Sequence, residues 1–193
     1  MLVALEGSSP TIRGENNRKY YVWEAYQNTK QAPNRIYVPG PAAISWGPSG
    51  INIRKMANKA TEFIKGHSGP IFLIGWSRGA AACVQTALDL QRSGYSQNIQ
   101  ALFLFDAVDQ DGSTSDFLNF IPGNVVNAYH AIATGKSWMD RQLFPTCART
   151  AAPSVNLVTK DFNTTHGGVA GAGDTDAGSH EWMWNHLRSH GVV

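Results

Sequence analysis

The sequence predicts a single α/β domain with a largely parallel sheet. Short apolar runs alternate along the chain with longer segments of helical periodicity, and this alternation is typical of parallel strands joined by helical crossovers. The run Ile71-Phe72-Leu73-Ile74 is apolar at every position, as expected of a strand that is covered on both faces. The chain has 193 residues, of which 42% are hydrophobic and 16% charged, so it has the length and composition of one globular domain.

The expected strands are apolar runs that end at turn residues. Leu2–Leu5 is followed by the polar turn Glu6-Gly7-Ser8-Ser9-Pro10, and Arg35–Val38 is followed by Pro39-Gly40-Pro41. The other expected strands lie at residues 70–75, 99–108 and 154–159.

The expected helices follow the 3.6-residue period. Residues 51–65 place apolar side chains three or four positions apart, and residues 18–30 do the same with aromatic side chains. An alanine-rich segment at 78–92 stops before Gly94, a residue typical of helix ends. The remaining helices are expected at residues 124–134 and 180–190.

Charge and targeting patterns exclude several classes of partner. The net charge is +2 and no basic block stands out, so nucleic acid is not indicated. No apolar run is long enough to span a bilayer, and the start Met1-Leu2-Val3-Ala4-Leu5-Glu6 lacks the features of a signal peptide. The two cysteines, Cys83 and Cys147, form no metal or redox motif. We therefore expect no stable membrane insertion, and a protein that is cytoplasmic or exported without a classical signal peptide.

The segment Gly75-Trp76-Ser77-Arg78-Gly79 fits the pattern G-x-S-x-G between a buried strand and a helix. This context is typical of a nucleophile elbow, in which a sharp turn presents the serine hydroxyl above the sheet. Small residues two before and two after Ser77 relieve the crowding, and the N–H of Arg78 lies where one oxyanion-hole donor is expected. The alternative is an ordinary glycine-rich turn with an N-capping serine.

A catalytic serine of this kind needs an acid and then a base later in the chain. Asp106 follows the next apolar strand and should lie at the same sheet edge as Ser77, with Asp109 and Asp161 as alternatives.

The expected base is His166, in the glycine-rich loop Thr165-His166-Gly167-Gly168. His130 falls in an expected helix, where packing is the simpler role, and His67 precedes the serine and is expected to cap a helix end.

Five stretches, taken in order, carry a family resemblance. The chain resembles the α/β-hydrolase domains of type VI secretion phospholipase effectors and their bacterial and fungal relatives. The family motifs are D-G-T, G-F-S-R-G-A, F-D-T-V, H-A-L-A-L-D-E and H-S-D-V-G-G. The matching stretches here are Glu6-Gly7-Ser8, Gly75-Trp76-Ser77-Arg78-Gly79-Ala80, Phe105-Asp106-Ala107-Val108, His130-Ala131-Ile132-Ala133 and His166-Gly167-Gly168-Val169. Gly168 replaces the aspartate of the histidine loop, and Gly135-Lys136 replaces the aspartate-glutamate pair.

The resemblance implies a serine hydrolase with Ser77 as nucleophile, Asp106 as acid and His166 as base. It also implies a three-layer sandwich, and a second oxyanion donor from the turn at Gly7 and Ser8. Residues 1–193 would form a minimal α/β-hydrolase domain without a separate lid.

The expected reaction is hydrolysis of a small ester or lipid-like substrate, such as a phospholipid or lysophospholipid, without a metal or other cofactor. The alternatives are a catalytically inactive binding module and an acyltransferase.

Two further sets of residues are each open to two interpretations. Trp76 and Trp46 are candidates for an apolar acyl pocket, or plain core. His186 and His190 could share a metal with Asp174, Asp176 or His180, or could simply lie on a solvated helix.

Overall fold

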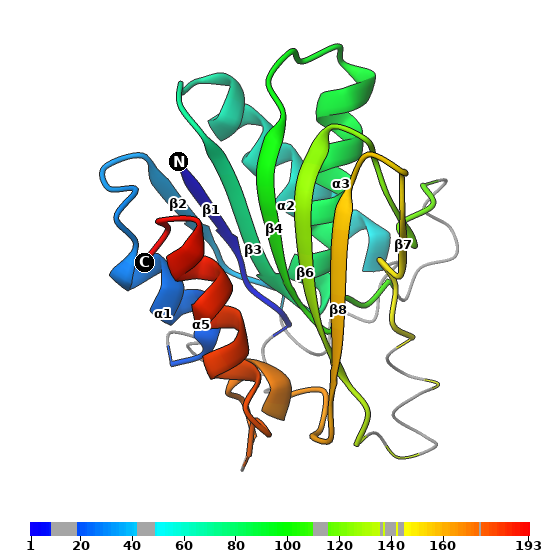
Figure 1. Cartoon of the computed structure of the whole chain (residues 1–193). Coiled ribbons are helices and arrows are strands. Elements are labelled where there is room, and N and C mark those ends of the chain that lie inside the picture. Colours follow the sequence, from blue (N-terminus) through cyan, green and yellow to red (C-terminus); the bar gives the residue numbers. More distant parts are fainter. Residues whose placement is uncertain are drawn as a thin grey trace.

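A six-stranded parallel sheet organises the molecule (Figure 1). The structure is a computed structural model, and it describes residues 1–8, 19–41, 49–109, 116–135, 137, 142, 145–173 and 175–193. The strand order is β2-β1-β3-β4-β6-β8, and each neighbouring pair is parallel. The strands are β1 (Leu2–Leu5), β2 (Arg35–Val38), β3 (Ile71–Trp76), β4 (Ile99–Phe105), β6 (Val125–Ala133) and β8 (Asn156–Phe162).

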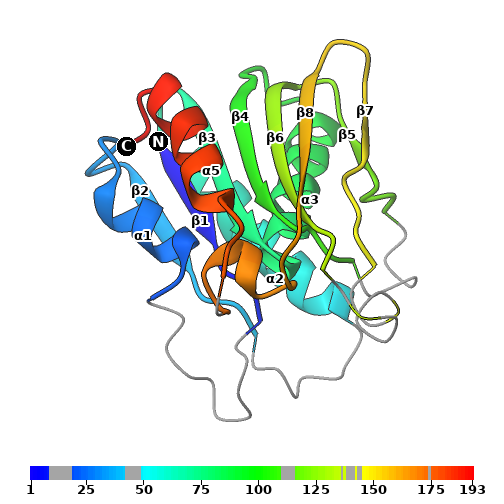
Figure 2. The same cartoon turned by 60° about the horizontal axis from the view of Figure 1, so that its bottom comes forward.

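Helices cover both faces of this sheet (Figure 2). Helices α1 (Tyr21–Asn28) and α5 (Ser179–Ser189) lie on one face, and α2 (Ser49–Lys65) and α3 (Arg78–Arg92) lie on the other. Each face has its own apolar core, because alternate strand residues point to opposite sides. These layers confirm the predicted α/β sandwich with its parallel sheet.

The register of the central strands places two chain reversals side by side. Trp76, the last residue of β3, pairs with Phe105, the last residue of β4. The next residues are Ser77 and Asp106, which therefore leave the sheet at the same edge. Figure 2 brings this edge toward the viewer.

The predicted helix at 124–134 is wrong, because most of this segment forms strand β6, which lies between β4 and β8. Its alanines favour a helix, but its valines, tyrosine and isoleucine suit a strand that is buried on both faces. The surrounding sheet decides between these tendencies, and His130 therefore lies on a strand.

The other elements depart from the predictions only at their ends or in small additions. Helix α5 and strand β8 lie within one to three residues of the expected bounds. At the end of α2, His67 donates a hydrogen bond from Nδ1 to the Phe63 carbonyl oxygen, 2.8 Å away. The unpredicted elements are a small sheet of β5 (Phe120–Ile121) and β7 (Thr150–Ala151) and the 3-10 turn η1 (Gly168–Ala170). Among the described helices, none is both long and apolar enough to cross a membrane.

Candidate active site

Ser77 occupies a strained turn between β3 and α3. Its backbone angles are φ 56° and ψ −124°, a conformation that costs free energy in a residue other than glycine. Neighbouring glycines make the turn possible: a Cβ added to Gly79 would lie 2.0 Å from the Leu5 carbonyl oxygen, and one on Gly75 would lie 2.6 Å from backbone atoms of Gly79 and Ala80. The backbone thus has the strand-to-helix turn that the motif predicts.

His166 joins Ser77 to Asp106. Its Nε2 lies 2.9 Å from Ser77 Oγ, and its Nδ1 lies 2.7 Å from Asp106 Oδ2. An ionised carboxylate only accepts hydrogen bonds, so with Asp106 ionised the Nδ1–H donates to it and Nε2 accepts a hydrogen bond from the Ser77 hydroxyl. Ser77 makes no side-chain cap to α3, in contrast to the N-capping alternative.

The carboxylate of Asp106 is fully buried and held from both sides. While Oδ2 faces His166, Oδ1 accepts a hydrogen bond of 3.0 Å from the Thr146 hydroxyl. The Asp106 backbone has φ 39° and donates its N–H to the Ala131 carbonyl oxygen, 2.7 Å away on β6. Both carboxylate oxygens therefore have defined partners, which fixes the carboxylate's orientation toward the imidazole.

The alternative acids lie elsewhere. Asp161 is exposed on the outer strand β8, opposite Ile132. Asp109 lies beyond β4 and is half-buried, and its charge contributes, after the dominant effect of burial, to a raised pKa of the Cys147 thiol. Among these three aspartates, Asp106 is the one that the described structure pairs with His166.

Trp76 supports the loop that carries His166. Its indole N–H donates to the His166 carbonyl oxygen over 3.1 Å, and its ring packs edge-on against Tyr20. Gly168 stands where the family that the sequence resembles has an aspartate. The backbone is closely packed there, because a Cβ on residue 168 would lie 2.4 Å from the Thr175 carbonyl oxygen. The loop is thus held by Trp76 and by tight packing, without an acidic side chain at position 168. The other tryptophan candidate, Trp46, lies outside the described residues.

The predicted oxyanion donors lie at the end of β1 and the start of α3. Arg78 is the first residue of α3, where backbone N–H groups have no acceptor within the helix. The N–H of Gly7 donates to Glu6 Oε1 at 3.1 Å, so it points to a side chain of its own turn. Ser8 follows directly, within the described residues, and its Oγ is buried without a described hydrogen-bond partner.

Glu6 is a buried acid next to this turn. Its side chain accepts hydrogen bonds from the Gly7 N–H and, at 3.2 Å, from the Tyr37 hydroxyl. Burial raises the pKa of Glu6 to about 8, and the two hydrogen bonds offset part of that effect. The carboxyl group is therefore largely neutral at pH 7, with polar partners on both oxygens.

The closing helix does not gather a metal site among its described neighbours. His186 stacks on the Tyr129 ring with centroids 3.9 Å apart, and His190 Nε2 lies 2.9 Å from the Tyr129 hydroxyl. Asp176 accepts a hydrogen bond from the Tyr21 hydroxyl, and His180 pairs with Glu24. In the described ranges no three metal-binding side chains come together, and Asp174 lies outside those ranges.

Comparisons with known proteins add no relatives to this description. The chain matches none of the protein-family models and none of the curated proteins with which it was compared.

Sequence patterns do not identify Thr146 and do not connect His130 with the acid. Thr146 bonds to Asp106, and His130 bonds to the backbone beside it. A lone threonine 40 positions from its partner has no local signal. From the sequence, His130 is a possible base that is assigned to packing, because its segment is predicted to be a helix and not a strand.

Proposed function

We propose that this protein is a serine hydrolase that cleaves carboxylic esters through an acyl-enzyme. The observation that carries the proposal is the hydrogen-bonded series Ser77–His166–Asp106 at a strained strand-to-helix turn. A serine hydroxyl is a weak nucleophile until an adjacent base takes its proton, and a carboxylate on the far nitrogen sets the tautomer which accepts that proton. An inactive binding module has no need for this arrangement.

In the first half of the reaction, Ser77 Oγ attacks the ester carbonyl carbon while His166 Nε2 takes the hydroxyl proton. The carbonyl π electrons move to oxygen, which becomes the oxyanion of a tetrahedral intermediate. The N–H groups of Arg78 and of the Gly7-Ser8 turn donate to this oxyanion, with Ser8 the better placed of the pair because the Gly7 N–H is engaged by Glu6. The C–O bond then breaks, and the imidazolium returns its proton to the leaving alcohol.

In the second half, His166 takes a proton from water as the hydroxide oxygen attacks the acyl carbon on Ser77. Collapse of the second tetrahedral intermediate breaks the bond to Oγ, and Ser77 recovers its proton from His166. The products are a carboxylic acid and an alcohol. Transfer of the acyl group to an acceptor other than water would use the same residues, and product analysis separates the two outcomes. The substrate class follows from the resemblance: a small ester or a lipid-like ester such as a lysophospholipid.

The direct test is hydrolysis of short-chain nitrophenyl esters. Ser77→Ala should lower kcat by at least about 10³-fold, because it removes the nucleophile. The matched control is Ser154→Ala, since Ser154 is exposed in the turn before β8 and should not affect the rate. Hydrolysis by the Ser77→Ala protein at close to the wild-type rate would overturn the proposal.

A further inference from the structure

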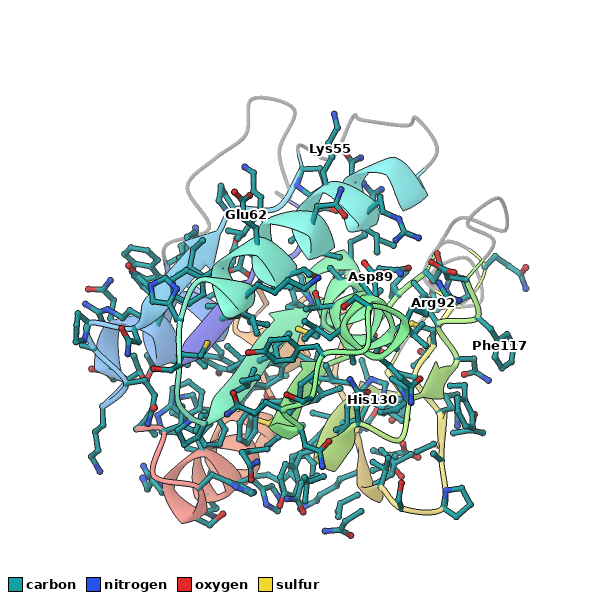
Figure 3. All side chains as sticks on the ribbon, turned by 90° about the horizontal axis from the view of Figure 1, so that it is seen from above. Lys55, Glu62, Asp89, Arg92, Phe117 and His130 are labelled. Carbon is teal, nitrogen blue, oxygen red and sulfur yellow. The ribbon has the colours of Figure 1, made fainter. Side chains whose placement is uncertain are left out.

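His130 is a fully buried histidine on the strand next to the candidate triad. It lies on the face of the sheet that α3 covers (Figure 3). Its Nε2 accepts the Ala107 backbone N–H over 3.0 Å, and its Nδ1 faces the Ala148 carbonyl oxygen at 3.2 Å. A backbone N–H only donates and a carbonyl oxygen only accepts, so the ring is neutral with its proton on Nδ1.

The two bonds of His130 reach the two segments that hold the triad acid. Ala107 directly follows Asp106, and Ala148 lies two residues after Thr146, whose hydroxyl bonds to Asp106. These segments also meet directly, because the Cys147 N–H donates to the Ala107 carbonyl oxygen at 2.8 Å. One imidazole therefore ties the backbone of the acid to the backbone of its hydroxyl donor.

Both segments contain a residue in the left-handed region. Asp106 has φ 39° and Ala148 has φ 53°. Such angles cost roughly 1–2 kcal/mol in a residue with a Cβ, and they persist only where neighbouring groups hold them. The hydrogen bonds of His130 reach the Ala148 carbonyl oxygen and the N–H of the peptide that follows Asp106. They can therefore help to hold both residues at these φ angles.

We propose that His130 is a positioning residue for the triad acid. It holds the Asp106 and Thr146 segments together, so that one carboxylate oxygen faces Thr146 and the other faces His166 Nδ1. It acts through backbone groups and Asp106, and has no part in proton transfer. This inference rests on the proposed function for its effect on catalysis, but its effect on the His166–Asp106 hydrogen bond is measurable without any substrate.

The kinetic test uses three substitutions of His130. His130→Phe removes both hydrogen bonds, and we expect kcat for nitrophenyl esters to fall about 10- to 100-fold at nearly constant KM, as a displaced acid no longer orients the base. His130→Asn places an amide nitrogen near the Nδ1 position and keeps the bond to Ala148. His130→Gln extends an amide oxygen toward the Nε2 position and keeps the bond to Ala107. Each should recover part of the loss.

The control is Val125→Ala, at the other end of the same strand. Val125 is buried, so its truncation destabilises β6 without touching the segments around Asp106. A merely structural role of His130 predicts that Val125→Ala and the His130 variants lower kcat equally at equal loss of stability. That result would overturn the inference, and the Asn and Gln variants allow the comparison if His130→Phe does not fold.

A second readout is the low-field proton resonance of the His166 Nδ1–H, identified by its absence in His166→Gln. We expect it to shift or broaden in the His130 variants and to stay unchanged in Val125→Ala. An unshifted resonance in His130→Phe would overturn the inference even if the wild-type protein hydrolyses no ester. Conversely, a shifted resonance in a protein without esterase activity would support the role of His130 while the proposed function fails.

Discussion

Two neighbouring residues of β6 serve two different histidine clusters. His130 belongs to the site cluster, which we define as Ser77, Asp106, His130 and His166. Tyr129 faces the other side of the sheet and belongs to the α5 cluster, defined as Tyr129, Trp182, His186 and His190. Alternation along one strand thus places His130 and Tyr129 on opposite faces of the sheet.

The clusters differ in what their histidine nitrogens meet. In the site cluster, His166 lies between a buried carboxylate and a serine hydroxyl. In the α5 cluster, burial lowers the pKa of both His186 and His190, and the described residues give neither a carboxylate partner. The His186 ring stacks on Tyr129 and the His190 ring meets it edge-on, so both rings pack α5 against the sheet, but no carboxylate of the described residues orients them for proton transfer. The carboxylate, rather than the number of histidines, distinguishes the candidate site.

The largest contrast between the clusters is expected from Asp106→Asn. The amide can no longer fix the tautomer of His166, so kcat should fall about 10⁴-fold. The double variant His186→Gln/His190→Gln changes the other cluster and should stay within about 3-fold of wild type. Steady-state hydrolysis of nitrophenyl esters measures both. Similar losses in the two proteins would remove the distinction between the clusters.

Next in size is the pH dependence set by Glu6, the buried acid beside the candidate oxyanion turn. Its pKa rises from 4.5 to about 8 on folding, so the folded state favours the neutral carboxyl. This contribution to stability is fully present below pH 4.5 and is lost as the pH rises toward about 8. Glu6→Gln does not titrate, so its free energy of unfolding should rise relative to that of wild type by roughly 4–5 kcal/mol between pH 4.5 and about 8.

Denaturant unfolding at several pH values tests this expectation. Glu62→Gln is the control, since Glu62 is exposed on the outer side of α2 (Figure 3). If the free energies of unfolding of wild type and Glu6→Gln change with pH in parallel, Glu6 is not the cause of the pH dependence.

A smaller effect is expected from Thr146→Val, which keeps the shape of the side chain and removes the hydroxyl that bonds to Asp106. Loss of one hydrogen bond to a buried carboxylate should lower kcat about 10-fold and leave KM nearly unchanged. Thr150→Val is the control, since its hydroxyl bonds to the Asn119 carbonyl oxygen in the small sheet. If Thr146→Val keeps the wild-type kcat, the Thr146 hydroxyl is not needed to orient Asp106.

The smallest effect concerns the α5 cluster. The lowered pKa values of His186 and His190 mean that folding favours the neutral rings, so their contribution is present above pH 6.5 and is lost as the pH falls below it. Since both side chains are partly exposed, the change should stay under about 1 kcal/mol. Thermal unfolding below pH 6.5 should be less pH-dependent in His186→Gln/His190→Gln than in wild type. If the pH dependence of thermal unfolding is the same in the double variant as in wild type, groups other than these two histidines cause it.

Sequence patterns predict most of this fold because the helices follow the 3.6-residue period and most strands are short apolar runs that end at turn residues. Among the main strands the exception is β6, where alanines between β-branched and aromatic residues suit either a helix or a strand, and only the neighbouring strands decide. Within the candidate site, Ser77 follows from a local motif, and Asp106 and His166 follow from chain order and sheet edges. Thr146 and His130 do not, because their roles depend on contacts 18 to 40 residues away along the chain.

The proposed function requires that His166 activates Ser77 in a site that accepts acyl and phosphonyl groups. Labelling with a fluorophosphonate probe, followed by peptide mapping, tests it without knowledge of the natural substrate. We predict that the wild-type protein is labelled on Ser77 alone, and that His166→Gln is labelled far more slowly because the serine keeps its proton. A folded wild-type protein that is not labelled, or is labelled on another residue, would contradict the claim.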